Sequence, residues 1–122
     1  MTGLGSSHPQ RKILIVEDDR MTRRLLSALL RAWNYEVMEA GTLHDGLNQV
    51  QRANFVLLDL MLPDGNGIAI LERIRDHGLA ARVAVVTAET GAVLRDASRL
   101  GAALILEKPI NVNDLLRWLT HE

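Results

Sequence analysis

Polar side chains follow four short apolar segments of this chain, and their types suggest one kind of chemistry. Three acids follow the first segment, a fourth acid the second, a hydroxyl the third and an ammonium the last: Glu17, Asp18, Asp19, Asp59, Thr87 and Lys108. Carboxylates that cluster repel one another and need a compensating cation. Oxygen ligands, in a chain without cysteine, suit Mg²⁺ rather than Zn²⁺. A lysine and a hydroxyl beside Mg²⁺ suit a phosphoryl group.

Each of these residues also has an ordinary structural interpretation. An acidic run before a helix caps it and favours its dipole, and a lone Asp at a strand end is often a turn residue. Thr87 could cap the helix that follows it, and Lys108 could belong to a simple loop. The prediction of a site therefore depends on a fold that brings these residues together.

The segment around Asp59 organises the predicted fold. Residues 55–58 are uninterrupted apolar residues and predict a strand buried on both faces. Because a charge is costly inside a sheet, Asp59 is expected at the carboxyl end of this strand. Pro63 and the cluster at 64–67 (Asp-Gly-Asn-Gly) then break the extended chain. Open parallel sheets bind their ligands outside these strand ends, so Asp59 lies where chemistry is expected.

Strands and helices alternate five times along the chain. Strands are predicted at residues 12–16, 35–40, 55–58, 82–86 and 102–106, and helices at 20–33, 43–51, 68–76, 91–100 and 112–121. This alternation is typical of an α/β fold with a doubly wound parallel sheet and helices on both faces. The more polar strand at 35–40 suits an edge, and the other four suit central positions.

Helical periodicity also predicts which side chains face the core. In the first helix the inward stripe is Met21, Leu25, Ala28, Leu29 and Ala32. In the last helix it is Val112, Leu115, Leu116 and Leu119. Trp118 falls at the margin of that stripe, so it is expected to be partly exposed and to contribute to association with a partner or a second copy. Thr42 and Asn111 are expected to cap helices, and Asn34 to end one in a left-handed conformation.

Composition narrows the classes of function. The 122 residues are 48% hydrophobic with a formal net charge of −1, which excludes general disorder and gives no electrostatic reason to expect direct binding to nucleic acid or a membrane. No apolar run is long enough to cross a bilayer, and a cytoplasmic location is expected. Residues 1–10, rich in Gly, Ser and Pro, are expected to form a flexible tail before a single domain at 11–122.

Several motifs together resemble the receiver domain of two-component response regulators. In chain order they are Val16-Glu17-Asp18-Asp19, Leu57-Leu58-Asp59, Leu62-Pro63-Asp64, Val86-Thr87-Ala88 and Lys108-Pro109. The resemblance implies a flavodoxin-like fold with strand order 2-1-3-4-5. It also implies that a histidine kinase or a phosphotransfer protein phosphorylates an aspartate of this chain. The domain would then signal to a downstream protein through protein–protein contacts, rather than act as an enzyme on a separate substrate.

The resemblance implies a role for each residue that matches a motif. Asp59 corresponds to the phosphoacceptor. Glu17 and Asp18 correspond to the acidic pair that holds Mg²⁺ together with Asp59 and the backbone carbonyl of Met61. Asp18 is expected to be the direct ligand of the pair, and Glu17 to act through water. Asp19, one position further on, is expected to cap a helix.

Two further residues are expected to contact the phosphoryl group. Thr87 corresponds to the switch hydroxyl, and Lys108 to the lysine whose ammonium pairs with the phosphoryl oxygens. The resemblance also implies that the Lys108–Pro109 peptide is cis, which positions the lysine. Ile105 and Ile110 stand where the family usually has aromatic residues. Signalling is therefore expected to involve residues 88–100, with Thr90 recapping the helix there, unless partners respond to the new charge directly.

Two other classes of protein share parts of this pattern. A Mg²⁺-dependent phosphohydrolase of the haloacid dehalogenase type also uses an Asp nucleophile, but it needs a second Asp two residues later, where this chain has Met61. A flavin-binding electron carrier shares the topology, but the carboxylates would repel the flavin phosphate. Within the receiver interpretation, the chain is expected to be either a stand-alone protein that acts through a partner or a fragment of a larger regulator.

Overall fold

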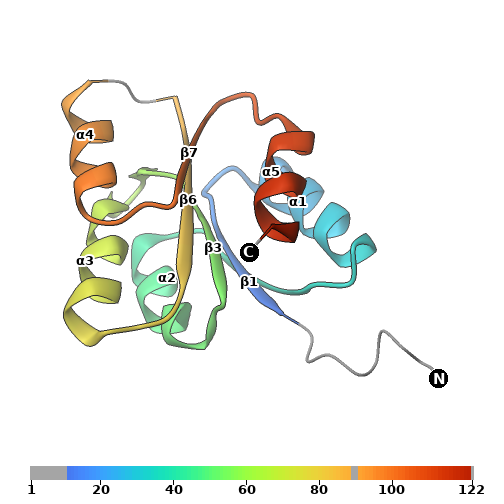
Figure 1. Ribbon diagram of the computed structural model, residues 1–122, viewed down its shortest axis with the longest axis horizontal. Helices are drawn as coiled ribbons and strands as arrows, with labels where there is room; N and C mark the ends of the chain where they lie inside the picture. The colour runs from blue at the N-terminus through green and yellow to red at the C-terminus, as the bar shows by residue number, and fades with distance from the viewer. Residues whose placement is uncertain (1–10, 89–90, 122) are drawn as a thin grey trace.

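The computed structural model describes residues 11–88 and 91–121, so the expected tail at 1–10 and the expected cap at Thr90 lie outside the described residues. Five parallel strands form one sheet in the order β2-β1-β3-β6-β7 (Figure 1). The strands are β1 (Lys12–Val16), β2 (Glu36–Ala40), β3 (Phe55–Leu58), β6 (Arg82–Thr87) and β7 (Leu104–Glu107). This order confirms the predicted doubly wound α/β fold and its strand order.

Helices cover both faces of the sheet (Figure 1). One face carries α1 (Arg20–Ala32) and α5 (Val112–Thr120). The other carries α2 (Leu43–Gln49), α3 (Ile68–His77) and α4 (Ala92–Arg99). The helix predicted at 43–51 changes at Val50 into a short 3₁₀ turn, Val50–Arg52, which returns the chain to β3.

The central strands are apolar on both faces because both faces are covered. In β3 all four residues are buried, as the uninterrupted apolar run predicts. Phe55 and Leu57 pack on the side of α1 and α5, whereas Val56 and Leu58 pack on the side of α2, α3 and α4. β3 therefore has no polar face, and the first charged residue after it is Asp59, which directly follows Leu58.

Local signals for helix ends are confirmed where they were predicted. The side chains of Asp19, Thr42 and Asn111 each accept a hydrogen bond from the backbone N–H three residues later, so all three are N-caps. Asn34 has a φ of 71°, and Gly78 ends α3 with a φ of 61°. These left-handed residues stop the two helices and redirect the chain toward the next strand.

The prediction for the inward face of α1 is wrong. The helix buries Leu26, Ser27 and Leu30, whereas Met21 and Leu25 are 71% and 66% exposed. Apolar residues occur on both sides of this helix, so periodicity offers two stripes and cannot choose between them. The choice depends on tertiary contacts, and the stripe of Met21 and Leu25 is left on the outer surface.

The prediction that Trp118 is partly exposed is also wrong. Its side chain is only 9% exposed and packs edge-on against Phe55, with ring centroids 5.3 Å apart and planes at 72°. Leu115 and Leu119 are buried as predicted, but Val112, at the start of the helix, is exposed. A rotation of the helix that fills the space beside Phe55 with the larger indole ring accounts for this difference.

One strand and one turn differ from what the sequence predicts. The apolar residues of the fifth strand favour a central position, but among the described residues β7 pairs with β6 alone and lies at an edge. It is apolar because Leu104 and Ile105 pack against the cores on opposite faces of the sheet. The turn cluster at 64–67 does not simply break the chain: β4 (Met61–Leu62) and β5 (Gly65–Asn66) pair as a small antiparallel hairpin.

Candidate functional site

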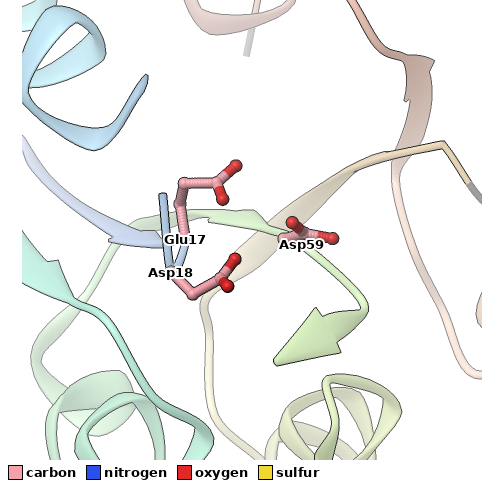
Figure 2. A group of neighbouring side chains, drawn as sticks. All are labelled: Glu17, Asp18 and Asp59. Carbon is pink, nitrogen blue, oxygen red and sulfur yellow. The ribbon is translucent and has the colours of Figure 1, made fainter. Parts of the chain in front are cut away.

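Three carboxylates meet at the carboxyl ends of β1 and β3. Glu17 and Asp18 follow β1, Asp59 follows β3, and one oxygen from each lies within 4.8 Å of the others. Glu17 and Asp59 are only 4% and 7% exposed, whereas Asp18 is exposed. Figure 2 shows the three side chains grouped at this edge of the sheet. The Asp59 N–H donates to the carbonyl of Val16 (2.9 Å), which holds the two strand ends in register.

Lys108 supplies the positive charge of the site from the end of β7. Its Nζ lies 2.8 Å from Oε1 of Glu17 and 2.8 Å from Oδ2 of Asp59. The backbone N–H of Lys108 donates to the carbonyl of Thr87 (3.1 Å), and the peptide to Pro109 is cis, as the resemblance implied. The sheet therefore brings together residues that are 91 and 49 positions apart in the chain.

Burial and charge act against each other in this cluster. Burial raises the pKa of the Glu17 carboxyl, and the nearby Asp59 charge adds to the rise, although the hydrogen bond from Lys108 opposes it. Burial by itself would lower the pKa of Lys108, but its hydrogen bonds to Asp59 and Glu17 and their negative charges outweigh burial and raise that pKa. Glu17 and Asp59 therefore form an acidic pair that the ammonium of Lys108 stabilises.

The donor set of the cluster fits a hard divalent ion. Glu17, Asp18 and Asp59 offer carboxylate oxygens alone, which is the ligand chemistry that Mg²⁺ prefers. Asp19 is directed elsewhere, because its carboxylate accepts hydrogen bonds from the backbone N–H and the hydroxyl of Thr22. Those hydrogen bonds lower the pKa of Asp19. Its assignment as a helix cap is thereby confirmed.

The loop after Asp59 folds back closely over it. The Met61 N–H donates to Oδ1 of Asp59 (3.1 Å), and the Gly67 N–H donates to the carbonyl of Leu60 (2.8 Å). A Cβ at Gly67 would lie 2.6 Å from the carbonyl oxygen of Asp59, a distance that real Cβ atoms essentially never show. Glycine at this position is therefore required by the close approach of the loop to the site.

Sequence reasoning missed the contact that anchors this loop. The carboxylate of Asp64, next to Pro63, accepts hydrogen bonds from the N–H groups of Leu43 (2.7 Å) and His44 (3.0 Å) in the first turn of α2. These bonds lower the pKa of Asp64. The partners lie about twenty positions away in the chain, so no local pattern could have indicated the contact.

Thr87 ends β6 beside the end of β7. The residue is buried, and its position is opposite Glu107 in the parallel register of the two strands. The hydrogen bond from the Lys108 N–H to its carbonyl ties the two strand ends together. A hydroxyl and an ammonium therefore belong to neighbouring strand ends at the same edge of the sheet as the carboxylates.

Comparison with known proteins identifies the class to which this fold and this group of strand-end residues belong. Residues 13–120 match the response regulator receiver domain family. The chain belongs to this family of two-component systems.

Solved and curated relatives show the same class. A CheY-like receiver domain protein from Methanospirillum hungatei JF-1 superposes with a TM-score of 0.85 at 27% identity, over 93% of each chain. The two-component response regulator-like protein PRR37 of Oryza sativa subsp. indica is 33% identical over 90% of this chain, and the transcriptional regulatory protein DltR of Streptococcus agalactiae is 32% identical over 86%. This chain spans only 16% and 48% of those two proteins.

A helix that spans a membrane must be both long and apolar. Among residues 11–88 and 91–121, no helix has both the length and the apolar character needed to cross a bilayer.

Proposed function

We propose that this receiver is phosphorylated on Asp59 and signals through the charge and conformation that result. The observation that supports the proposal most directly is the pairing of Asp59 with Lys108 at 2.8 Å beside two further carboxylates at the carboxyl edge of the sheet. The proposed receiver domain comprises residues 11–122, preceded by a tail at residues 1–10. Its proposed location is the cytoplasm.

Asp59 is the nucleophile of the proposed reaction. One carboxylate oxygen attacks the phosphorus of the donor, a new O–P bond forms, and the bond from phosphorus to the donor breaks with its electron pair leaving on the donor. The product is an acyl phosphate, and its hydrolysis by water returns the carboxylate and releases inorganic phosphate. The charge at position 59 changes from about −1 to about −2 while the phosphoryl group is present.

Lys108 and Thr87 are the proposed partners of the phosphoryl oxygens. The Lys108 ammonium already lies against the Asp59 carboxylate, so a phosphoryl group there would stay within reach of its charge. Thr87 supplies a hydroxyl that can move toward the new oxygens. This movement is the proposed switch.

Glu17, Asp18, Asp59 and the backbone carbonyl of Met61 are the proposed ligands of Mg²⁺. When bound, the ion screens the repulsion between Asp59 and the incoming phosphoryl oxygens. Asp18, the exposed member of the cluster, is the proposed direct ligand of the acidic pair, and Glu17 acts through water. Asp18→Asn should therefore weaken Mg²⁺ binding more than Asp19→Asn in a calorimetric titration; the reverse order would move the metal site by one residue.

A histidine kinase or phosphotransfer protein is the proposed donor, and α1 offers a surface for it. Met21 and Leu25 form an exposed apolar stripe on the outer face of this helix, flanked by Arg20 and Arg24. The helix starts directly after the acidic residues of the site. An acidic helix from the donor would bury the stripe and pair with the two arginines.

A downstream protein is the proposed target of the signal, and the receiver itself is not proposed to touch nucleic acid or membranes. The relative DltR is named a transcriptional regulatory protein, so a longer protein containing this receiver could have such an output. We propose no activity on a separate substrate, because a phosphohydrolase of the type considered above needs an acid where this chain has Met61.

A labelling experiment tests the proposal. The protein is incubated with Mg²⁺ and a small acyl phosphate, and intact mass is measured for the wild type, Asp59→Asn and Asp64→Asn. One phosphoryl group should add to the wild type and to Asp64→Asn, whose carboxylate serves as a helix cap, but not to Asp59→Asn. Undiminished labelling of Asp59→Asn would refute the assignment, and steady turnover of a phosphate ester would favour the phosphohydrolase.

A further inference from the structure

Arg23 reaches from α1 to the backbone of the acidic pair. Its Nη1 donates to the carbonyl of Glu17 at 2.7 Å and, at a longer 3.4 Å, to the carbonyl of Asp18. Its Nε donates to Oε1 of Glu39 on β2 at 3.2 Å. The Arg23 side chain is only 19% exposed, and its contacts to Glu17 and Glu39 are partly buried.

The contacts of Arg23 restrain a segment that has no regular structure of its own. Glu17 and Asp18 lie between the end of β1 and the cap of α1, outside both elements. The Glu17 N–H donates to the carbonyl of Ala40 at the end of β2 (3.0 Å), and Arg23 holds the same segment through its carbonyl oxygens. The guanidinium group is planar with donors in a fixed arrangement, so it can bind a carboxylate on one edge and carbonyls on another. Glu39 therefore acts as a fixed point from which Arg23 sets the position of the acidic pair.

Gly41 provides the space that this arrangement needs. A Cβ at Gly41 would lie 3.1 Å from Nη1 of Arg23, so a larger residue would press on the nitrogen that binds the Glu17 carbonyl. Glu39 is also within 3.9 Å of Arg31, which helps to fix the carboxylate. Three segments, β2, the turn after it and α1, thus converge on one guanidinium group.

We infer that Arg23 is a positioning residue for the metal, an inference that rests on the proposed function of the acidic cluster. Arg23 binds the residues that carry the ligands through their carbonyl oxygens, so it holds their backbone and does not engage their carboxylates. Its positive charge alone would repel a divalent cation. A role through geometry and a role through charge therefore predict opposite effects when the side chain is shortened and neutralised.

The test is a Mg²⁺ titration of the whole chain by calorimetry, with amide chemical shifts recorded to show that the fold is intact. Arg23→Lys keeps the charge but cannot bind Glu39 and the carbonyls together, and outer-shell changes of this kind typically weaken metal binding 10–100-fold. We expect about tenfold, because Arg23 contacts the backbone of the ligand residues and not their carboxylates. Arg75→Lys, the same change at an arginine of α3 whose side chain is 55% exposed, should leave the affinity unchanged.

Two further variants separate the possible causes. Arg23→Gln should also weaken binding if geometry dominates, but should strengthen it if the charge of Arg23 is what matters. Gly41→Ala leaves every hydrogen-bonding group in place and only crowds Nη1 of Arg23, so it should also weaken Mg²⁺ binding. If the Arg23 variants fail to fold, Gly41→Ala tests the positioning role by itself, and an unchanged affinity would overturn that role. In phosphorylation by a small acyl phosphate, Arg23→Lys should raise the Mg²⁺ concentration needed for half-maximal rate while leaving the rate at saturating Mg²⁺ unchanged.

The outcomes distinguish this inference from the function on which it rests. If the wild type does not bind Mg²⁺, the proposed metal site is wrong. If the wild type binds and folded Arg23→Lys binds equally well, or if folded Arg23→Gln binds more tightly, the metal site stands and the positioning role of Arg23 is overturned.

Discussion

Replacing Lys108 with Met should destabilise the fold substantially at neutral pH, because Lys108 is the cation between two buried carboxylates. Its Nζ lies 2.8 Å from an oxygen of Glu17 and 2.8 Å from an oxygen of Asp59. Removing one partner of a fully buried ion pair costs about 3–5 kcal/mol. The Lys108 side chain is 32% exposed, so water screens part of the interaction, and we expect a loss of about 2–3 kcal/mol.

This loss should depend on pH in a defined direction. Burial already raises the pKa of Glu17 above the value it has in an unfolded chain, so its ionised form destabilises the fold at pH values above the raised pKa. Without Lys108 the ionised carboxylate loses its partner and the pKa rises further. The loss should therefore be largest near neutral pH and should shrink as the pH falls and Glu17 takes up a proton in the folded state.

Urea denaturation near pH 7 and near pH 5, analysed by linear extrapolation, measures both effects. Lys12→Met is the matched control, since the Lys12–Glu36 pair is 3.9 Å apart with side chains 43% and 50% exposed, and such pairs contribute about 0–1 kcal/mol. Mg²⁺ should restore part of the stability of Lys108→Met by binding the folded state. Equal losses in the two variants, or a loss in Lys108→Met that does not change with pH, would refute the reasoning.

Gly67→Ala should cost about 1–3 kcal/mol in urea denaturation, because a Cβ there meets the Asp59 carbonyl; a neutral result would mean that the loop can move away without cost. Asp64→Ala should reduce hydrogen-exchange protection in the first turn of α2, because the Asp64 carboxylate binds two N–H groups there. In the wild type the protection that Asp64 provides should be lost as the pH falls through the pKa of Asp64, which lies below the ordinary Asp value. Because the pKa of Lys108 is raised, its stabilising contribution should persist up to the ordinary lysine value and disappear as the pH rises through the raised pKa, a loss that Lys108→Met should not show. A phosphoryl mimic at Asp59 should shift amide signals across residues 88–100; shifts confined to groups that touch the mimic or Mg²⁺ would favour direct recognition of the charge.

The strands and the site could be predicted because their signals are local. An uninterrupted apolar run that ends at Asp59 identifies both a central strand and the side chain at its end, and the same logic applies to Thr87 and Lys108. Parallel strands then bring these ends together whatever the details of the helices. The caps at Asp19 and Thr42 were predictable for the same reason, since a cap and its partner lie three residues apart.

Contacts between distant segments could not be predicted in the same way. The rotation of α1 was assigned incorrectly because Leu26 and Leu25 are neighbours on a helix with apolar residues on both sides, and only the sheet selects one of them. The binding of Asp64 to the start of α2, and of Arg23 to the carbonyl of Glu17, depend on how the elements are placed in space. Such contacts become visible only once the three-dimensional structure is known.

The most direct test of the account identifies the phosphorylated residue itself. After reaction with Mg²⁺ and a small acyl phosphate, borohydride reduction converts an aspartyl phosphate to homoserine, which tandem mass spectrometry locates in the sequence. We predict homoserine at position 59 and at no other acidic residue. Homoserine at Asp18 or Asp64, or its absence from a correctly folded protein under these conditions, would contradict the assignment of Asp59 as the phosphoacceptor.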